Sequence, residues 1–323
     1  MLKRVKLISL TANPQLTKEI AKRLGVPVLD TKALHFADGE ILFESNETFR
    51  GDDVYIIQST CAPVTERLME LLICVDALKR ASARSVNAVI PYFGYARQER
   101  KAKPRQPITA KLVANLLTVA GIDRLICMDL HAAAIQGFFD IPVDDISAIN
   151  IFSSYFDKKN LTNIACVSPD HGGVVRASRL AQKLNASLVI IDKRRTRPNV
   201  SEIVAIVGDV KDKNCIIVDD IADTCGTLCH AADKLKSLGA KKVFAVVTHG
   251  ILSGDAIHTI NKSGLDELVI TDTIPLPPEK RCNKIKVLSV GPLLSDVIRA
   301  IVNGTSLSFT LHDFASSTRK KNK

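Results

Sequence analysis

The sequence contains no tryptophan, and aromatic residues make up only 5% of its 323 positions. Hydrophobic residues nevertheless account for 46% of the chain, so aliphatic side chains must build its cores. This composition excludes a disordered chain, a collagen and a coiled coil. No apolar run approaches the ~20 residues that a membrane helix needs, so we expect no membrane span. The start of the chain has no long apolar region with a cleavage site, and residues 5–10 favour a first β-strand over a signal peptide.

The eight cysteines include no CxxC pair. Most of them lie inside apolar runs, where a thiol behaves as a small core hydrophobe. Unpaired core thiols favour a reducing compartment, so we expect a cytoplasmic protein. Cys225, Cys229 and His230 lie close together, but their spacing matches no common zinc motif, and a zinc site is the weaker alternative.

The formal net charge is +10 and the isoelectric point is about 9.2. A basic protein attracts anions, which here means nucleic acid, phosphorylated metabolites or an anionic membrane. Composition does not choose among these three partners.

The two halves of the chain resemble each other at a nearly constant offset of 157 to 160 positions. The matching pairs are Ser9 with Ser168, Leu24 with Leu184, Ile57 with Ile217 and Val86 with Val243. Each half alternates short β-branched runs with helical patterns, and Gly121 and Gly239 are placed to end helices. The pattern predicts two tandem α/β domains, 1–146 and 147–323, each with a mainly parallel sheet flanked by helices, and a C-terminal tail that packs back on the first domain.

Residues 215–227 carry the most informative motif. A buried apolar strand there delivers the adjacent acids Asp219 and Asp220 to a short loop, directly before a predicted helix. The loop residues are Asp223, Thr224, Cys225, Gly226 and Thr227. Amide groups at a helix start bind anions, and carboxylates accept hydrogen bonds from sugar hydroxyls, so the segment predicts a sugar-phosphate cradle. The alternative is an ordinary capped helix.

Two basic segments follow predicted strands. Residues 91–112 form a polar loop with six cations, which suits a lid over polyphosphate; a solvated loop or a nucleic-acid patch is an equal alternative. Residues 190–199 place Lys193, Arg194, Arg195 and Arg197 at a strand end, where they can neutralise phosphate charge. Nucleic-acid surfaces use aromatic side chains for stacking. Aromatic residues are scarce in this chain, which favours a small phosphorylated ligand over nucleic acid.

Three further segments contain candidate ligand-binding residues. His131 follows an apolar run and Asp170 lies in a strand-end loop, so together they could hold Mg²⁺ with nucleotide phosphates, with His171 as a rival ligand. Gly172 and Gly173 let a phosphate approach the backbone. In residues 34–41, Phe36 offers a ring for a purine, while Asp38 and Glu40 offer acceptors; a buried phenylalanine in an ordinary turn is the simpler interpretation.

Residues 215–227 resemble the ribose-phosphate signature of the phosphoribosyltransferase superfamily, with Cys225 where many members carry glycine. Taken in order, FADGE, PYFGYARQERKAKPRQPITAK, MDLHAAAIQGFFDIPVD, VSPDHGG, DKRR and VDDIADTCGT resemble the class I ribose-phosphate pyrophosphokinase family over nearly the whole chain. The resemblance implies two phosphoribosyltransferase-like domains. It also implies transfer of the diphosphoryl group of ATP to ribose 5-phosphate for nucleotide biosynthesis, giving phosphoribosyl pyrophosphate and AMP.

The resemblance also implies roles for individual residues. ATP would be bound by Phe36, Asp38, Gly39, Glu40, Arg97 and Gln98, partly across a subunit interface. Ribose 5-phosphate would be bound by Arg195, Asp219, Asp223, Thr224, Cys225, Gly226 and Thr227. Lys193 and Arg195 would be catalytic, and His131 and Asp170 would contact Mg²⁺. On the residues themselves no side chain is an obvious general base, and Asp220 or Asp223 is the candidate.

The same resemblance implies hexamers built from dimers and regulation by ADP and phosphate, for which residues 303–309 resemble the regulatory segment. No nucleic-acid or membrane partner is expected. The rival functions are a phosphoribosyltransferase, a non-catalytic homologue and a basic nucleic-acid binder.

Overall fold

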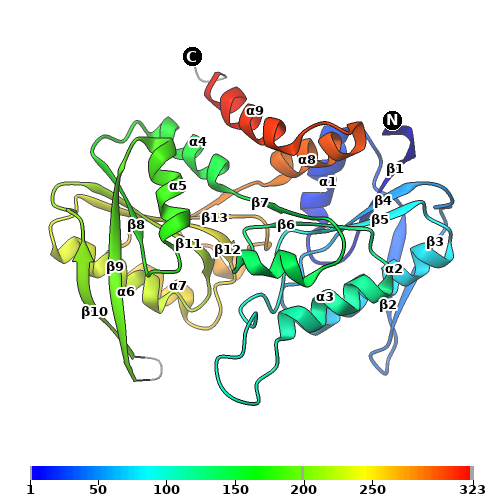
Figure 1. The fold of residues 1–323 in the computed structure, drawn as a ribbon, viewed down its shortest axis with the longest axis horizontal. Helices are drawn as coiled ribbons and strands as arrows, with labels where there is room; N and C mark the ends of the chain where they lie inside the picture. Colours follow the sequence, from blue (N-terminus) through cyan, green and yellow to red (C-terminus); the bar gives the residue numbers. More distant parts are fainter. Residues whose placement is uncertain (1, 198–199, 321–323) are drawn as a thin grey trace. The chain divides into compact units, whose positions relative to one another are not determined.

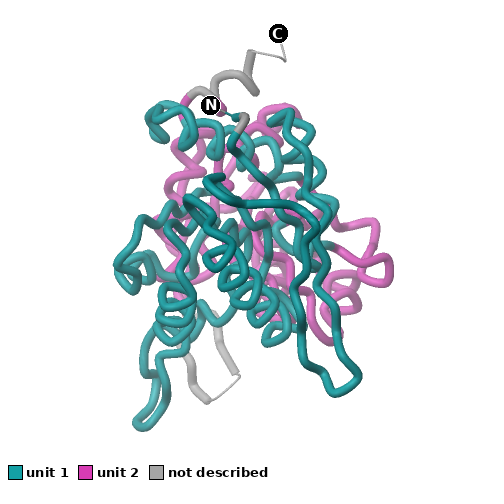
Figure 2. Tube along the Cα trace, turned by 90° about the vertical axis from the view of Figure 1, so that its right-hand side faces the viewer, with its two compact units in different colours: residues 1–147, 273–275, 289–311 teal, residues 148–272, 276–288, 312–323 magenta. Residues whose placement is uncertain are grey.

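The protein is described by a computed structural model, which covers residues 2–197 and 200–320. Side chains are described for these residues except 3, 193–204, 313 and 315–320. The chain divides into two compact units, shown in different colours in Figure 2. Unit 1 comprises residues 1–147, 273–275 and 289–311, and unit 2 comprises residues 148–272, 276–288 and 312–323.

Unit 1 is built on a five-stranded parallel sheet in the order β1-β4-β5-β6-β7 (Figure 1). Its strands are β1 (Val5–Ser9), β4 (Asp53–Ile57), β5 (Ser85–Ile90), β6 (Arg124–Met128) and β7 (Val143–Ile146). Its helices are η1 (Leu2–Arg4), α1 (Pro14–Leu24), α2 (Val64–Arg80), α3 (Thr109–Ala120), η2 (Ala133–Phe138) and α8 (Gly291–Asn303). A separate antiparallel hairpin joins β2 (Thr31–His35) to β3 (Ile41–Ser45) and projects from the body of the unit.

The strands of this sheet are apolar without alternation because helices cover both of its faces. All but the first residue of β4, β5 and β6 are buried. Alternate strand residues such as Ile56 and Ala88 pack with α2 and α3, while α1 and α8 pack together over the opposite face. Gly121 ends α3 in the left-handed conformation at φ 109°, as predicted.

Unit 2 contains a seven-stranded sheet in the order β10-β9-β8-β11-β12-β13-β14, in which only the β9–β10 pair is antiparallel. Its strands are β8 (Ile164–Ser168), β9 (Ser187–Arg197), β10 (Val200–Val207), β11 (Asn214–Ala222), β12 (Lys242–Gly250), β13 (Glu267–Thr271) and β14 (Ile285–Leu288). Its helices are α4 (Ile149–Lys159), α5 (Val174–Leu184), α6 (Gly226–Ser237), α7 (Ala256–Lys262) and η3 (Pro278–Lys280). The last helix of the chain is α9 (Leu307–Lys320).

The strand order confirms the predicted duplication. The strands β1, β4, β5, β6 and β7 correspond to β8, β11, β12, β13 and β14, and each set occurs in the same spatial order. The correspondence extends to single contacts, because the parallel bridge between Leu7 and Val28 has its counterpart in the pairing of Val167 with Val189. The β2–β3 hairpin of unit 1 therefore occupies the place of the β9–β10 hairpin in unit 2.

The basic segment around residue 195 differs from the prediction. It was expected to follow a strand ending near Asp192, but β9 continues to Arg197. Beyond Ile190, β9 has no further pairing with β8 and pairs only with β10. The cations therefore lie within a two-stranded ribbon that β10 stabilises, rather than in a loop.

No described helix combines the length and the apolar character that a membrane crossing requires.

Replacing the buried Leu71 of α2 by alanine should leave a cavity beneath the unit 1 sheet. We expect the free energy of unfolding to fall by about 2–5 kcal/mol, measured by urea denaturation. The control is Met69→Ala on the same helix, where the side chain is 43% exposed and the expected loss is below about 0.5 kcal/mol. Equal losses in the two variants would contradict the assignment of this helix face to the core.

Candidate active site

The loop between β11 and α6 forms the centre of the candidate site in unit 2. It consists of Asp223, Thr224 and Cys225, and Cys225 takes the left-handed conformation at φ 62°. Glycine adopts this conformation without strain, whereas cysteine does so at a cost. The side chain of Cys225 does not cap α6, so the first amide groups of the helix can meet an anion. Thr224 and Thr227 are exposed beside them.

Asp223 is held by the loop that follows β12. The hydroxyl of Ser253 donates a hydrogen bond to the Asp223 carboxylate, and the Ser253 amide donates to the Asp223 carbonyl at 3.1 Å. The cradle is therefore braced by a residue thirty positions away that no local sequence motif indicated.

The acid pair at the end of β11 is neutralised by an arginine from α5. Arg176 Nη1 lies 3.3 Å from Asp220 Oδ1 and 3.7 Å from Asp219 Oδ1. Burial, and then the neighbouring Asp220 carboxylate, raise the pKa of Asp219 to about 8, and Arg176 opposes this shift. Arg176 was not predicted from the sequence, where its only signal is its position in the first turn of the helix after the Asp170 loop.

Asp170 lies in the loop between β8 and α5, next to the acid pair in the sheet order. Its Oδ1 accepts a hydrogen bond from the Gly173 amide at 3.0 Å, which fixes the turn. A side chain at Gly173 would place its Cβ 2.9 Å from Ser168 Oγ, so the close approach requires glycine. His171, the rival ligand, has its Nε2 3.0 Å from Asp192 Oδ1.

The cysteines near the cradle do not form a metal site. Burial raises the pKa of Cys225 to about 12 and also raises that of Cys229, so both thiols stay protonated. Within the part of the chain that the structure describes, Cys225, Cys229 and His230 do not bring their ligand atoms together. The weaker zinc alternative at these residues therefore has no support.

In unit 1, the predicted nucleotide residues form the tip of the β2–β3 hairpin. The Phe36 amide donates to the Glu40 carbonyl at 2.9 Å, and Gly39 closes the turn at φ 93°. The Glu40 amide donates to Asp38 Oδ1 at 3.1 Å. Phe36 is 52% exposed, so the interpretation as a buried phenylalanine is wrong and the residue is accessible to a ligand.

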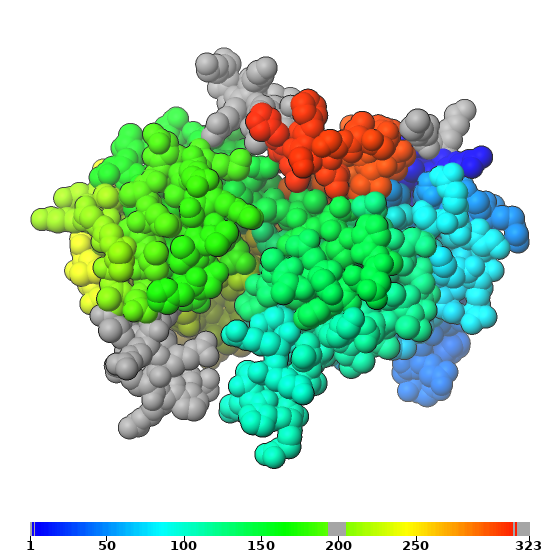
Figure 3. All heavy atoms as spheres, viewed as in Figure 1, coloured from blue at the N-terminus to red at the C-terminus, as the bar shows by residue number. Residues whose placement is uncertain are grey.

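Arg97 and Gln98 begin the basic loop, which stands out from the surface of unit 1 before α3 (Figures 1 and 3). Gln98 connects the loop to the start of α3, because its Oε1 accepts a hydrogen bond from Thr109 Oγ1 at 2.6 Å and its carbonyl accepts one from the Ala110 amide at 3.2 Å. Residues 101–108 are all exposed, as a lid or a solvated loop requires.

His131 is exposed in the loop after β6, which ends at Met128. The loop is anchored by Asp145 Oδ1, which accepts a hydrogen bond from the Leu130 amide at 3.1 Å. His131 belongs to unit 1 and Asp170 to unit 2, and their joint contact with Mg²⁺ stays a prediction.

The predicted residues form one group in each unit, and the group in unit 1 consists of the hairpin tip, the start of the basic loop and His131. Unit 2 brings Asp170, Asp219 and the 223–227 loop to the carboxyl ends of the adjacent strands β8 and β11. The side chains of Lys193 and Arg195 lie outside the described residues, although their backbone is part of β9.

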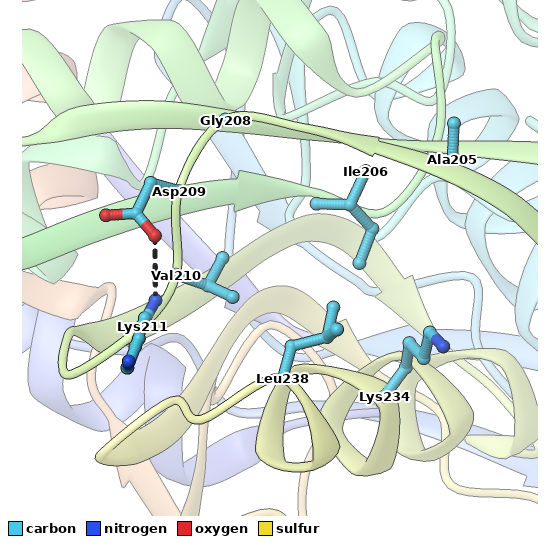
Figure 4. Close-up of a pocket in the computed structure, with 8 residues that line it drawn as sticks. All are labelled: Ala205, Ile206, Gly208, Asp209, Val210, Lys211, Lys234 and Leu238. Carbon is cyan, nitrogen blue, oxygen red and sulfur yellow. Dashed lines mark hydrogen bonds between the residues drawn. The ribbon is translucent and has the colours of Figure 1, made fainter.

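A cavity of about 400 Å³ in unit 2 lies away from this edge (Figure 4). Its lining residues are Ala205, Ile206, Gly208, Asp209, Val210, Lys211, Lys234 and Leu238. They come from the end of β10, the segment before β11 and the last turn of α6, which places the cavity at the amino edge of the sheet. None of the predicted site residues lines it.

Comparison with known proteins identifies the family. The model for the N-terminal domain of ribose phosphate pyrophosphokinase matches residues 5–121, and the model for the phosphoribosyl synthetase-associated domain matches residues 191–312. The ribose-phosphate pyrophosphokinase of Bacillus subtilis (strain 168) is 54% identical over 307 residues, which cover 95% of this chain and 97% of the relative. The chain belongs to the ribose-phosphate pyrophosphokinase family.

Other members of the family agree. The ribose-phosphate pyrophosphokinase of Clostridium perfringens is 54% identical over 314 residues, covering 96% of this chain and 98% of the relative. The crystal structure of phosphoribosylpyrophosphate synthetase from Mycobacterium smegmatis matches with a TM-score of 0.88 and 41% identity, covering 93% of this chain and 99% of that one. The fold class predicted from the sequence is confirmed.

Substitutions of Cys225 test whether the left-handed backbone at this position limits which residues the loop accepts. Cys225→Gly relieves a left-handed residue and loses a buried thiol, two effects of about 1 kcal/mol with opposite sign, so the free energy of unfolding should change by less than about 1 kcal/mol. Cys225→Val puts a β-branched side chain at positive φ and should cost more than about 2 kcal/mol. Urea denaturation measures both; a glycine variant less stable than the valine variant would contradict the account.

Because of Asp219, the free energy of unfolding should fall as the pH rises from about 4 to about 8. Its folded pKa of about 8 exceeds its ordinary 3.8, so the folded chain binds the proton more tightly and the stability it contributes is lost between these values. Asn does not titrate, so Asp219→Asn should remove this loss of stability with rising pH. The effect is about 1.4 kcal/mol for every tenfold difference in proton affinity between the folded and the unfolded chain. Denaturation without ligands at about pH 5, 7 and 9 measures it. The exposed Asp255→Asn is the control, and an unchanged decline in Asp219→Asn would refute the raised pKa.

Proposed function

We propose that this chain transfers the β,γ-diphosphoryl group of ATP to the anomeric hydroxyl of ribose 5-phosphate, giving phosphoribosyl pyrophosphate and AMP. Membership of the ribose-phosphate pyrophosphokinase family over nearly the full length carries the proposal. The reaction supplies the activated ribose for nucleotide biosynthesis. The strand-end cradle in unit 2 supports it, because it combines the two kinds of group that a sugar phosphate requires.

Ribose 5-phosphate is assigned to the 223–227 loop and the acid pair. The phosphate would lie against the first amide groups of α6, with the hydroxyls of Thr224 and Thr227 as further donors. The carboxyl group of Asp219 would form hydrogen bonds with the ribose hydroxyls, next to the guanidinium of Arg176. Asp223, held by Ser253, closes the loop.

ATP is assigned to the hairpin tip and the basic loop of unit 1. The exposed ring of Phe36 would stack on the purine, and Asp38 and Glu40 would accept hydrogen bonds from its amine or ribose. Gly39 shapes the turn, and Arg97 with Gln98 would approach the nucleotide from the loop. We expect part of this site to come from a neighbouring subunit.

Mg²⁺ is the expected cofactor, and the donor chemistry of Asp170 fits it. Oδ1 of Asp170 accepts the Gly173 amide, so Oδ2 is the oxygen directed elsewhere for a hard cation. His131 would add a contact, and nucleotide phosphates would supply further oxygens. When bound, Mg²⁺ neutralises phosphate charge.

The chain's own residues would position and neutralise the reacting groups. The anomeric oxygen forms a bond to the β-phosphorus as the bond from that phosphorus to the oxygen of AMP breaks. Lys193 and Arg195 would neutralise the charge that grows on the transferring group. The hydroxyl proton goes to solvent or to a carboxylate, for which Asp220 and Asp223 are the candidates.

We further expect a cytoplasmic enzyme that assembles as a hexamer built from dimers and responds to ADP and phosphate. In the structure, residues 303–309 span the end of α8 and the start of α9.

Lys193→Ala combined with Arg195→Ala should reduce ribose-5-phosphate-dependent AMP formation by at least about 100-fold, because two transition-state cations are lost. The matched control is Lys241→Ala with Lys242→Ala, which removes the same charge from exposed positions at the start of β12. Thermal melting should be similar for both double variants. Near-normal turnover in the Lys193→Ala, Arg195→Ala variant would contradict the assignment of these residues to catalysis.

A further inference from the structure

Three metal-ligating side chains meet in unit 1 outside the candidate active site. His35 Nε2 lies 3.5 Å from Glu70 Oε1 and 3.8 Å from Glu66 Oε1, and all three ligand atoms lie within 4.8 Å of one another. His35 ends β2, while Glu66 and Glu70 are four positions apart on α2 and so share one face of that helix. The cluster joins two elements that are distant in sequence.

We propose that His35, Glu66 and Glu70 bind one transition-metal ion of the Zn²⁺ class, with water as the fourth ligand. Zinc bonds of about 2.0–2.2 Å in a tetrahedron place ligand atoms about 3.3–3.6 Å apart, close to the two distances observed. A histidine nitrogen with carboxylate oxygens suits Zn²⁺, whereas Mg²⁺ prefers oxygen ligands and waters. The site would therefore prefer Zn²⁺ over Mg²⁺, the cation expected in the active site.

Glu70 is held in place for this role by a layer of polar partners. Its side chain is fully buried, which is costly for a carboxylate that lacks partners. Gln58 Nε2 donates to Oε2 at 2.6 Å and Arg67 Nη1 lies 3.5 Å from the same oxygen, while Thr11 Oγ1 lies 2.5 Å from both oxygens. Oε1 is the oxygen that faces His35.

The supporting layer is itself anchored. The Ala12 amide donates to Gln58 Oε1 at 3.0 Å, and Gln58 Nε2 also donates to the Arg67 carbonyl at 3.2 Å. Hydrogen-bonded partners of this kind orient carboxylate ligands in metal sites. Two glutamates and Arg67 leave a formal charge of −1 with a neutral imidazole, and this charge attracts a divalent cation.

A bound ion would fasten the β2–β3 hairpin to the first turns of α2. His35 directly precedes Phe36, so the ion would restrict the turn at residues 36–40. Any effect on nucleotide binding rests on the proposed function. The binding of the ion itself does not, and it can be measured without substrates.

The test is a competition titration of the full chain with Zn²⁺ against a chromophoric zinc indicator, in excess Mg²⁺ and without nucleotide. We expect the wild-type chain to bind one Zn²⁺ that His35→Ala and Glu66→Gln each bind at least about tenfold more weakly. These side chains are 39% and 42% exposed, so the variants should keep the fold, which circular dichroism checks. The control His230→Ala, an exposed histidine on α6, should retain wild-type affinity.

Co²⁺ gives a second readout on the unmodified chain. We expect visible absorption typical of four-coordinate Co²⁺, which added Zn²⁺ removes. Equal Zn²⁺ stoichiometry and affinity in the wild-type, His35→Ala and Glu66→Gln chains would overturn the proposal and leave the cluster as ion pairs only. Absence of the four-coordinate Co²⁺ spectrum would also overturn it. Neither result depends on turnover, so the proposed function is tested separately.

Discussion

Burial of parallel strands on both faces is the constraint on which the rest of this structure depends. With helices over both faces of each sheet, ligands bind at the carboxyl ends of the strands. In unit 2, β8 and β11 are neighbours and parallel, so their carboxyl ends place the Asp170 loop beside the acid pair and the α6 cradle. The chemistry follows from the topology.

Charge is arranged locally at this edge. Asp219 and Asp220 would repel each other in a buried setting, and the pKa of Asp219 is raised accordingly. Arg176, from the helix that follows the neighbouring strand, lies beside both carboxyl groups and opposes the rise in the pKa of Asp219. Much of the net charge of +10 that composition could not assign resides in two segments, residues 97–111 and 193–197. Both are basic enough to suit phosphate ligands.

The sequence predicted the features that depend on local pattern. The duplication, the buried parallel strands, the glycine end of α3 at Gly121 and the cradle loop all follow from periodicity and residue type. The extension of β9 through Arg197 did not, because it depends on pairing with β10. The exposure of Phe36 depends on the projection of a hairpin, which an apolar residue in a turn does not reveal.

The remaining contacts are tertiary. Ser253 reaches Asp223 from another strand-end loop, and His35 meets Glu70 only because the hairpin lies against α2. Neither pair has a spacing in sequence that a motif could capture.

The central claim is that a diphosphoryl group, and not a single phosphoryl group, is transferred to ribose 5-phosphate. The most direct measurement is ³¹P nuclear magnetic resonance of the wild-type chain with ATP, ribose 5-phosphate and Mg²⁺. The account predicts equal amounts of AMP and phosphoribosyl pyrophosphate, formed only when ribose 5-phosphate is present. Formation of ADP with a ribose bisphosphate, or AMP formation without ribose 5-phosphate, would contradict it.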